Sequence, residues 1–168
     1  MRPTITIKLK PYLQEFVICA LRDEAPKASR RHFIGAIISP LLEYTPKDHI
    51  PKPVKGEDYV TLPLPREAFG IETRRGTVYM SEENQRIFER TMRIYFKSIF
   101  FQFVDDKIRY NRQIKECILM FCAHYQISFN KINYEMLKKS YYRHRKSLKK
   151  RSFFAHYLSL CCPLIVLL

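Results

Sequence analysis

The longest regular pattern in the chain is SEENQRIFERTMRIYFKSIFFQFVDD, which covers residues 81–106 of 168. Two carboxylates near its start, Glu82 and Glu83, are favourable beside the positive end of a helix dipole. Large apolar residues then recur at spacings of four, three, four and four, at Phe88, Met92, Tyr95, Ile99 and Phe103. A stripe of this kind is typical of a helix that packs one face on a core. The pattern therefore predicts a core helix of roughly 20 residues that ends near Asp105.

Two more helices are predicted on the C-terminal side of this segment. The first covers residues 112–125, and its inward positions are Ile114, Ile118, Phe121, Cys122 and Tyr125. The last covers residues 133–150, and its buried side is marked by Tyr134, Leu137 and Tyr141. Both patterns follow the spacing of a single buried helical face, and residues 126–132 connect the two helices.

The N-terminal region begins with a strand pattern. Ile5, Ile7 and Leu9 alternate with polar residues, which predicts a half-buried strand. Pro11 suits the first turn of a following helix, because a proline there loses no helical hydrogen bond. Ser29 is a candidate N-cap of a second helix, whose apolar positions are Phe33, Ile34, Ile37, Ile38 and Leu41. Prolines predict a loop over residues 44–58, and short strand patterns cover residues 59–64 and 77–80.

These elements predict a mainly α fold with a few short β-strands (α+β), built as a helical bundle with a helix-turn-helix-like pair at its C-terminal side. The predicted division has three parts. Residues 1–56 form a small strand-helix-helix module with a proline-bearing loop, and residues 57–151 form a helical domain with a basic C-terminal helix. Residues 152–168 form an apolar tail.

Charge is distributed unevenly along the chain, whose net charge is +14. Lysine and arginine exceed aspartate and glutamate by five in residues 1–56 and by nine in residues 111–168, and they balance in residues 57–110. With 46% hydrophobic and 14% aromatic residues, the chain can bury a core and is no disordered basic tail. Positive charge gathered on particular segments suits a polyanion such as nucleic acid.

The densest basic run covers residues 138–151, where eight of 14 residues are lysine or arginine and none is acidic. Since one side of this helix is assigned to the core, the other side chains are expected to face solvent. The candidate nucleic-acid-binding residues are Lys138, Lys139, Tyr142, Arg143, Arg145 and Lys146, with Arg112 and Lys131 flanking them. We expect Tyr142, Arg143 and Arg145 to reach base edges, and the lysines to hold phosphates.

The helices predicted at 112–125 and 133–150 resemble the helix-turn-helix pair of DNA-binding proteins. In that family the second helix enters the major groove of double-stranded DNA. The resemblance implies a transcriptional regulator or accessory factor, and the small basic chain suggests a phage or other mobile element as its source. It also implies a homodimer, because two symmetric copies gain affinity from two half-sites. The connection departs from the family pattern, since it spans about seven residues and lacks glycine.

Over about 42 residues the N-terminal segment resembles a ribbon-helix-helix module. In that family the strands of two copies pair, and the outward side chains of the strands read the major groove. The resemblance implies a second nucleic-acid surface formed by Arg2, Thr4, Thr6 and Lys8. The alternative is an ordinary strand in a small mixed sheet.

The sequence contains no pattern that predicts catalysis, a metal or a cofactor. Cys117, Cys122 and His124 do not share one helix face, so the two cysteines are expected in the core. The pair Asp105-Asp106 has no third acidic cluster behind it, and the four glycines form no phosphate-binding loop. We therefore expect a protein that is not an enzyme. Five cysteines without a secretory signal pattern favour a reducing, intracellular compartment.

Two alternative functions follow from the same residues. In the first, the tyrosines stack on the bases of RNA or a single strand while the basic run follows the phosphates. In the second, the basic run meets anionic lipid or a protein partner, and residues 152–168 insert into a membrane. A spanning helix is disfavoured, because Pro163 interrupts the tail and the tail is shorter than the roughly 20 apolar residues that a bilayer requires. We favour packing of the tail on the core, with a disordered or atypical end that adds little to function as the remaining alternative.

Overall fold

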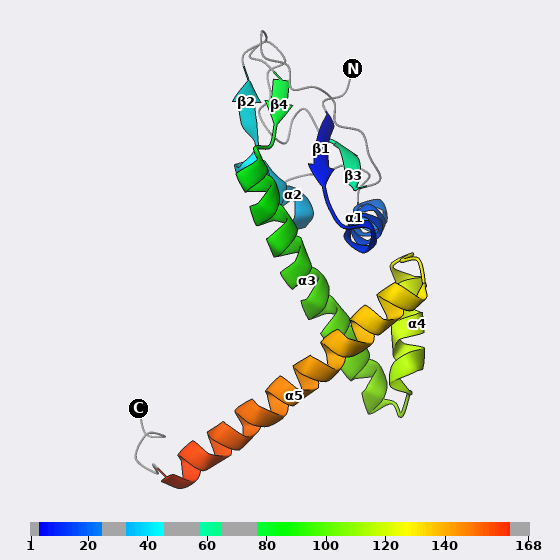
Figure 1. The fold of residues 1–168 in the computed structure, drawn as a ribbon, viewed down its shortest axis with the longest axis vertical. Coiled ribbons are helices and arrows are strands. Elements are labelled where there is room, and N and C mark those ends of the chain that lie inside the picture. The colour runs from blue at the N-terminus through cyan, green and yellow to red at the C-terminus, as the bar shows by residue number, and fades with distance from the viewer. Residues whose placement is uncertain (1–3, 25–32, 46–57, 65–76, 162–168) are drawn as a thin grey trace. The chain divides into compact units, whose positions relative to one another are not determined.

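The computed structural model describes residues 4–24, 33–45, 58–64 and 77–161, and it describes no side chain from Lys150 onward. The fold is mainly helical with short strands, as the sequence predicts (Figure 1). In chain order the elements are β1 (Thr4–Lys8), α1 (Pro11–Glu24), α2 (Phe33–Ile38), the short 3-10 helix η1 (Ser39–Leu41), β2 (Glu43–Thr45), β3 (Tyr59–Pro63), β4 (Thr77–Tyr79), α3 (Glu82–Arg109), α4 (Ile114–His124) and α5 (Lys131–Cys161). They group into two compact units: unit 1 comprises residues 1–100 and 122–128, and unit 2 comprises residues 101–121 and 129–168.

The predicted N-terminal strand is confirmed as β1, which pairs with β3 in an antiparallel two-stranded sheet. Ile5, Ile7 and Leu9 are at most 3% exposed, so the alternating apolar residues do face the core. Opposite them in β3, Val60 and Leu62 are also buried. The strands of a ribbon-helix-helix module pair with a second copy, whereas β1 pairs with β3 of its own chain.

The strand β2 corrects the predicted loop over residues 44–58. It pairs with β4 in a second antiparallel sheet, so Tyr44 and Thr45 are extended, while residues 46–57 lie outside the described chain. The local pattern could not show this, because the partner strand lies far away in the sequence. Both strand pairs join the predicted module 1–56 to residues beyond it, and the compact units divide the chain differently from the predicted domains.

Aromatic packing holds the helices of unit 1. Phe16 of α1 is fully buried and meets Phe96 of α3 edge-on, with ring centroids 5.1 Å apart. In α2 the apolar residues Ile34 and Ile38 are buried, while Phe33 is 46% exposed. The predicted N-cap of this helix, Ser29, lies outside the described residues.

The short segment 122–128 belongs to unit 1, in which it contacts α1 through polar groups. The Glu15 carboxylate accepts hydrogen bonds from the Ser128 backbone N–H, at 2.9 Å, and from the Ser128 hydroxyl. The Cys19 thiol lies 3.8 Å from the His124 carbonyl oxygen. These contacts tie the end of α4 and the following connection to α1.

The helix α3 is longer than predicted, and its buried stripe differs from the predicted one. Its fully or nearly fully buried residues are Phe88, Met92, Phe96, Phe100 and Val104. The predicted positions Tyr95, Ile99 and Phe103 are only partly buried, so this part of the prediction was wrong. Each step of four residues advances the stripe by about 40° around the helix. The stripe therefore winds along α3, as suits a helix that contributes residues to two compact units.

In unit 2, α4 lies beside α5 (Figure 1). The helix α5 continues to Cys161, so residues 152–161 of the predicted apolar tail extend this helix, and residues 162–168 lie outside the described chain. Within the residues that the structure describes, no helix combines the length and apolarity needed to cross a membrane.

Candidate nucleic-acid interface

A tight turn between α3 and α4 positions Arg112. Asn111 adopts φ 58°, in the left-handed region that asparagine tolerates better than most residues, and its N–H donates to the Ile108 carbonyl at 3.0 Å. The helix α4 starts at Ile114, so Arg112 stands just before its N-terminal end. The Arg112 guanidinium lies 3.9 Å from the Glu116 carboxylate, and both side chains are exposed.

The helix α5 is anchored in unit 2 by buried residues on one face. Leu137 and Tyr141 are 2% and 1% exposed, which confirms their predicted burial. The Tyr141 hydroxyl donates to Asp105 Oδ1 at 2.5 Å, and His144 Nε2 lies 3.6 Å from Asp105 Oδ2. The His144 ring also stacks on Phe101, with centroids 4.0 Å apart and planes 8° apart.

This anchor gives Asp105 a structural role within α3, although the sequence predicts that the helix ends near this residue. Its carboxylate connects two residues of α5 to α3. Burial, and then the hydrogen bond to Asp105, raise the pKa of Tyr141, which keeps the phenol protonated and able to donate at neutral pH. The rotation of α5 about its own axis is thereby fixed, and with it the side chains that α5 presents to solvent.

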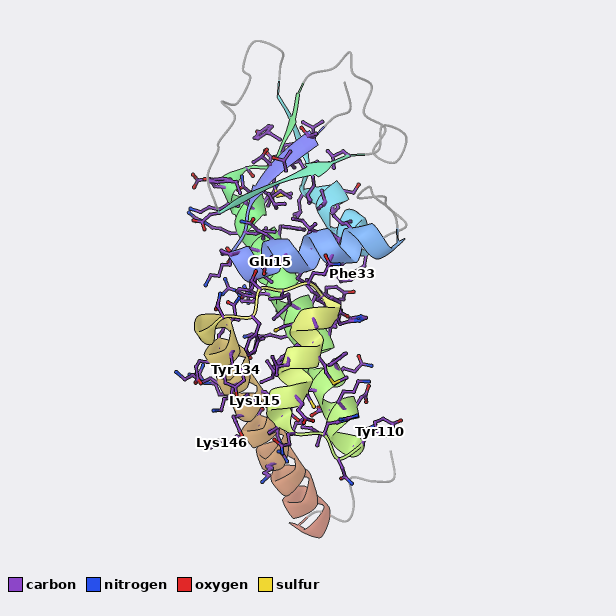
Figure 2. The ribbon with its side chains drawn as sticks, turned by 90° about the vertical axis from the view of Figure 1, so that its right-hand side faces the viewer. Glu15, Phe33, Tyr110, Lys115, Tyr134 and Lys146 are labelled. Atoms are coloured by element: carbon purple, nitrogen blue, oxygen red, sulfur yellow. The ribbon has the colours of Figure 1, made fainter. Side chains whose placement is uncertain are left out.

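A groove of about 480 Å³ lies where the start of α4 meets α5. Its basic and aromatic lining residues are Arg112, Lys115, Lys138, Arg145, Tyr134 and Tyr142. No aspartate or glutamate is among the described residues that line it. Figure 2 shows Lys115 and Tyr134 on the same side of unit 2. The groove thus gathers positive charge from two segments that are separate in the sequence.

A second depression of about 410 Å³ continues this surface along α5. It is lined by Tyr142, Arg145, Lys146 and Lys149, and it shares the first two with the groove. The positive surface therefore extends along α5 from Tyr134 to Lys149.

The basic residues of α5 fall into two stripes. Helical geometry places Tyr134, Lys138, Tyr142, Arg145 and Lys149 within roughly 80° of one another around the axis, and these residues are called the groove stripe below. The outer stripe lies about 100° farther round and consists of Lys139, Arg143 and Lys146, which are all exposed. The sequence prediction treated these residues as one surface, whereas helical geometry sets Lys139 and Arg143 apart from the groove stripe. Lys146 borders both, because it also lines the second depression.

The structure changes the assignment of some predicted residues and adds others. Tyr134 was predicted on the buried side, but it is only partly buried and lines the groove. Its ring lies 5.5 Å from the Lys138 ammonium and 5.6 Å from the Phe129 ring. The sequence analysis did not identify Lys115 or Lys149 as site residues. The four-residue spacing of Tyr134, Lys138 and Tyr142 did indicate the face of α5 on which Lys149 lies. The Lys131 side chain lies outside the described part of the structure.

The connection between α4 and α5 comprises residues 125–130, which is longer than the three or four residues usual in a helix-turn-helix. In place of a glycine, Gln126 takes φ 52°. The Ile127 N–H then donates to the Cys122 carbonyl at 2.8 Å, which closes the end of α4.

The second predicted surface, on β1, belongs to unit 1. Thr4 and Lys8 are exposed, and Thr6 Oγ1 lies 3.1 Å from Thr61 Oγ1 on the paired strand β3. The Lys8 ammonium lies 5.9 Å from the centroid of the Tyr59 ring. Arg2 lies outside the described residues. No charged cluster comparable to the groove stripe forms among the described residues of this strand.

The cysteines in α4 are core residues, as predicted. Cys117 and Cys122 are 0% and 1% exposed, and burial raises the pKa of the Cys122 thiol to about 11. Within the described part of the chain, His, Cys, Asp and Glu side chains form no group of three or more that could hold a metal ion.

The chain has no significant match among protein-family models, curated proteins or solved structures.

Proposed function

We propose that this protein binds nucleic acid through unit 2 and catalyses no reaction, with double-stranded DNA as its ligand. The observation that carries the proposal is the groove, because it combines four cations from two segments with no carboxylate in its described lining. Nucleic-acid backbones repeat a negative charge at short intervals, so an extended row of lysine and arginine matches them. The outer stripe enlarges this positive surface on the exposed face of α5.

On duplex DNA the two stripes would have different tasks. The outer stripe lies on the solvent side of α5 and is the part that would enter a major groove, with Arg143 at base edges and Lys139 and Lys146 at phosphates. Arg112 and Lys115 would hold the adjacent backbone. We include in the proposal a homodimer that acts as a transcriptional regulator or accessory factor of a mobile element.

We also place the protein in a reducing, intracellular compartment. Three of its cysteines, Cys19, Cys117 and Cys122, are buried as thiols. Thiols remain reduced in that compartment, so this state supports the proposal.

The test is fluorescence anisotropy with labelled duplex DNA across a salt series, with anionic lipid vesicles as a competing ligand. We expect binding that falls steeply with salt, because phosphate contacts release counterions. Arg143→Ala should cost about 1–3 kcal/mol of binding free energy on a preferred site and reduce site preference. Lys139→Ala should weaken all sequences alike and lower the salt slope by about 1. Absence of binding to any nucleic acid at low salt, or binding to vesicles alone, would overturn the proposal.

A further inference from the structure

We infer that the groove of unit 2 is a site for an unpaired nucleotide, whose base stacks on Tyr142. The inference rests on the proposed function in taking nucleic acid as the ligand. It adds the state of the ligand, a single-stranded segment, and the residue that recognises it.

Three tyrosines among the described side chains of α5 lie on or near the groove, and of these only Tyr142 offers an open ring. Tyr141 is 1% exposed and packs in the core. Tyr134 is partly buried, with Lys138 and Phe129 close to its ring. Tyr142 is 50% exposed, and within the described chain no aromatic ring stacks on it. Because single-strand sites use exposed aromatic rings as platforms for bases, Tyr142 is the residue suited to that role.

The charges around Tyr142 are placed for the phosphates on either side of a stacked base. Lys138 lies one helical turn before Tyr142 and Arg145 one turn after it, on the same face of α5. Lys115 and Arg112 approach from the start of α4. An aromatic ring between cations, in a groove of about 480 Å³, is the combination that holds a base by stacking and its backbone by charge.

A duplex cannot use this arrangement fully. Inside a duplex the faces of paired bases are covered by their neighbours in the stack, so only a base edge or a phosphate could reach the ring of Tyr142. A single strand, an overhang or a flipped base exposes a face that can enter the groove. The outer stripe remains available to duplex phosphates, so one protein can hold a junction between the two states.

In unit 2, Tyr142 belongs to the proposed binding site but adds little to the buried packing of α5. Leu137 and Tyr141 supply the buried contacts of α5, whereas the ring of Tyr142 is half exposed. Substitutions of Tyr142 should therefore leave the urea midpoint close to that of the unchanged protein. The urea midpoint is therefore measured for each Tyr142 variant.

The absence of tryptophan from the sequence allows a direct test. Tyr142→Trp introduces a single emitting indole into the groove, and Tyr110→Trp places one at a tyrosine that is 79% exposed in the same unit. Figure 2 shows Tyr110 on the side of unit 2 opposite to Lys115 and Tyr134, so it is a matched control. The full chain is titrated with a single-stranded oligonucleotide, a blunt duplex and a duplex with a short overhang. We expect the emission of Tyr142→Trp to be quenched by the first and third ligands, and that of Tyr110→Trp to remain unchanged.

A second measurement separates failure of the inference from failure of the proposed function. By anisotropy, Tyr142→Ala should weaken single-strand binding about tenfold or more, while Tyr142→Phe retains it because the ring suffices. Both variants should bind blunt duplex as the unchanged protein does. Binding of all ligands with no effect of Tyr142→Ala and no quenching would overturn the inference and leave the proposed function standing. If the unchanged protein binds no nucleic acid, the proposed function fails and the inference fails with it.

Discussion

Tyr141 and Tyr142 are neighbours in the sequence and have opposite environments. They lie about 100° apart on α5, and one is 1% exposed while the other is 50% exposed. The sequence could assign these sides, because Leu137 and Tyr141 share the helical spacing of a buried face. It could not show that Asp105 and Phe101 complete the anchor, since these residues come from a different helix.

At the residue scale, the Tyr141 hydrogen bond should contribute to stability. Tyr141→Phe keeps the buried ring and removes the donor to Asp105, whose side chain is 36% exposed and can be partly rehydrated. We expect a loss of about 1 kcal/mol in the free energy of unfolding, measured by urea denaturation. The matched control is Tyr142→Phe, which removes a hydroxyl from a half-exposed ring. Equal midpoints for the two variants would show that the bond to Asp105 adds nothing.

At the scale of elements, the local sequence pattern was sufficient to predict the buried residues where an element buries the same face along its whole length. The alternation of Ile5, Ile7 and Leu9 gave the buried side of β1 correctly. In α3 the rule failed, because aromatic residues occupy both the predicted stripe and the observed one. Phe96 and Phe100 are buried in place of Tyr95 and Ile99. Which of the two stripes is buried depends on the packing partners of α3, such as Phe16 of α1, and these are not visible in the local sequence.

The residues of the groove likewise could not be grouped from the local sequence pattern alone. Four predicted residues, Arg112, Lys138, Tyr142 and Arg145, line it together, but their grouping depends on how α4 lies beside α5. That pairing is also what adds Lys115, which no local pattern marks. The double-stranded DNA expected as ligand stays a prediction.

The start of α3 should respond to acid through Glu43 of β2. The Ser81 hydroxyl and the Asn84 side-chain amide donate to its carboxylate at 2.5 Å and 2.6 Å. Hydrogen bonds, first from Ser81 and then from Tyr79, lower the pKa of Glu43. A carboxyl group with a lowered folded pKa stabilises the fold fully above its unfolded pKa, about 4.3, and this contribution disappears as the pH falls through the lower folded value.

We therefore expect Glu43→Gln to be less stable than the unchanged protein near neutral pH, by a difference that shrinks as the pH falls below about 4. Urea denaturation over a pH series measures it. Glu83→Gln serves as the control, because Glu83 is an exposed carboxylate in the first turn of the same helix. A stability difference for Glu43→Gln that stays constant down to the acid limit would contradict the assigned role.

At the scale of the whole molecule, the question is whether binding follows from the total charge or from its location. The net charge is +14, and a field of that size attracts any polyanion at low salt. Residues 57–110 are neutral in sum, yet α3 carries exposed cations in unit 1, including Arg90 and Lys97. The chain therefore offers two sites where the same amount of charge can be changed.

The decisive comparison is Lys138→Glu with Arg145→Glu against Arg90→Glu with Lys97→Glu. Both pairs change the net charge by the same amount, but only the first pair lies in the groove stripe. If phosphates contact the groove, the first pair should weaken nucleic-acid binding on the order of 100-fold at low salt, because two contacts become two repulsions. The second pair should weaken it less than about tenfold, and that smaller loss should vanish at 0.15 M salt, where charges separated by more than about 8 Å are screened. Anisotropy at two salt concentrations measures both effects, with urea denaturation to show that each variant is folded. Equal losses for the two pairs at both salt concentrations would mean that nucleic acid is attracted by the field of the whole protein, and that the groove is not its binding site.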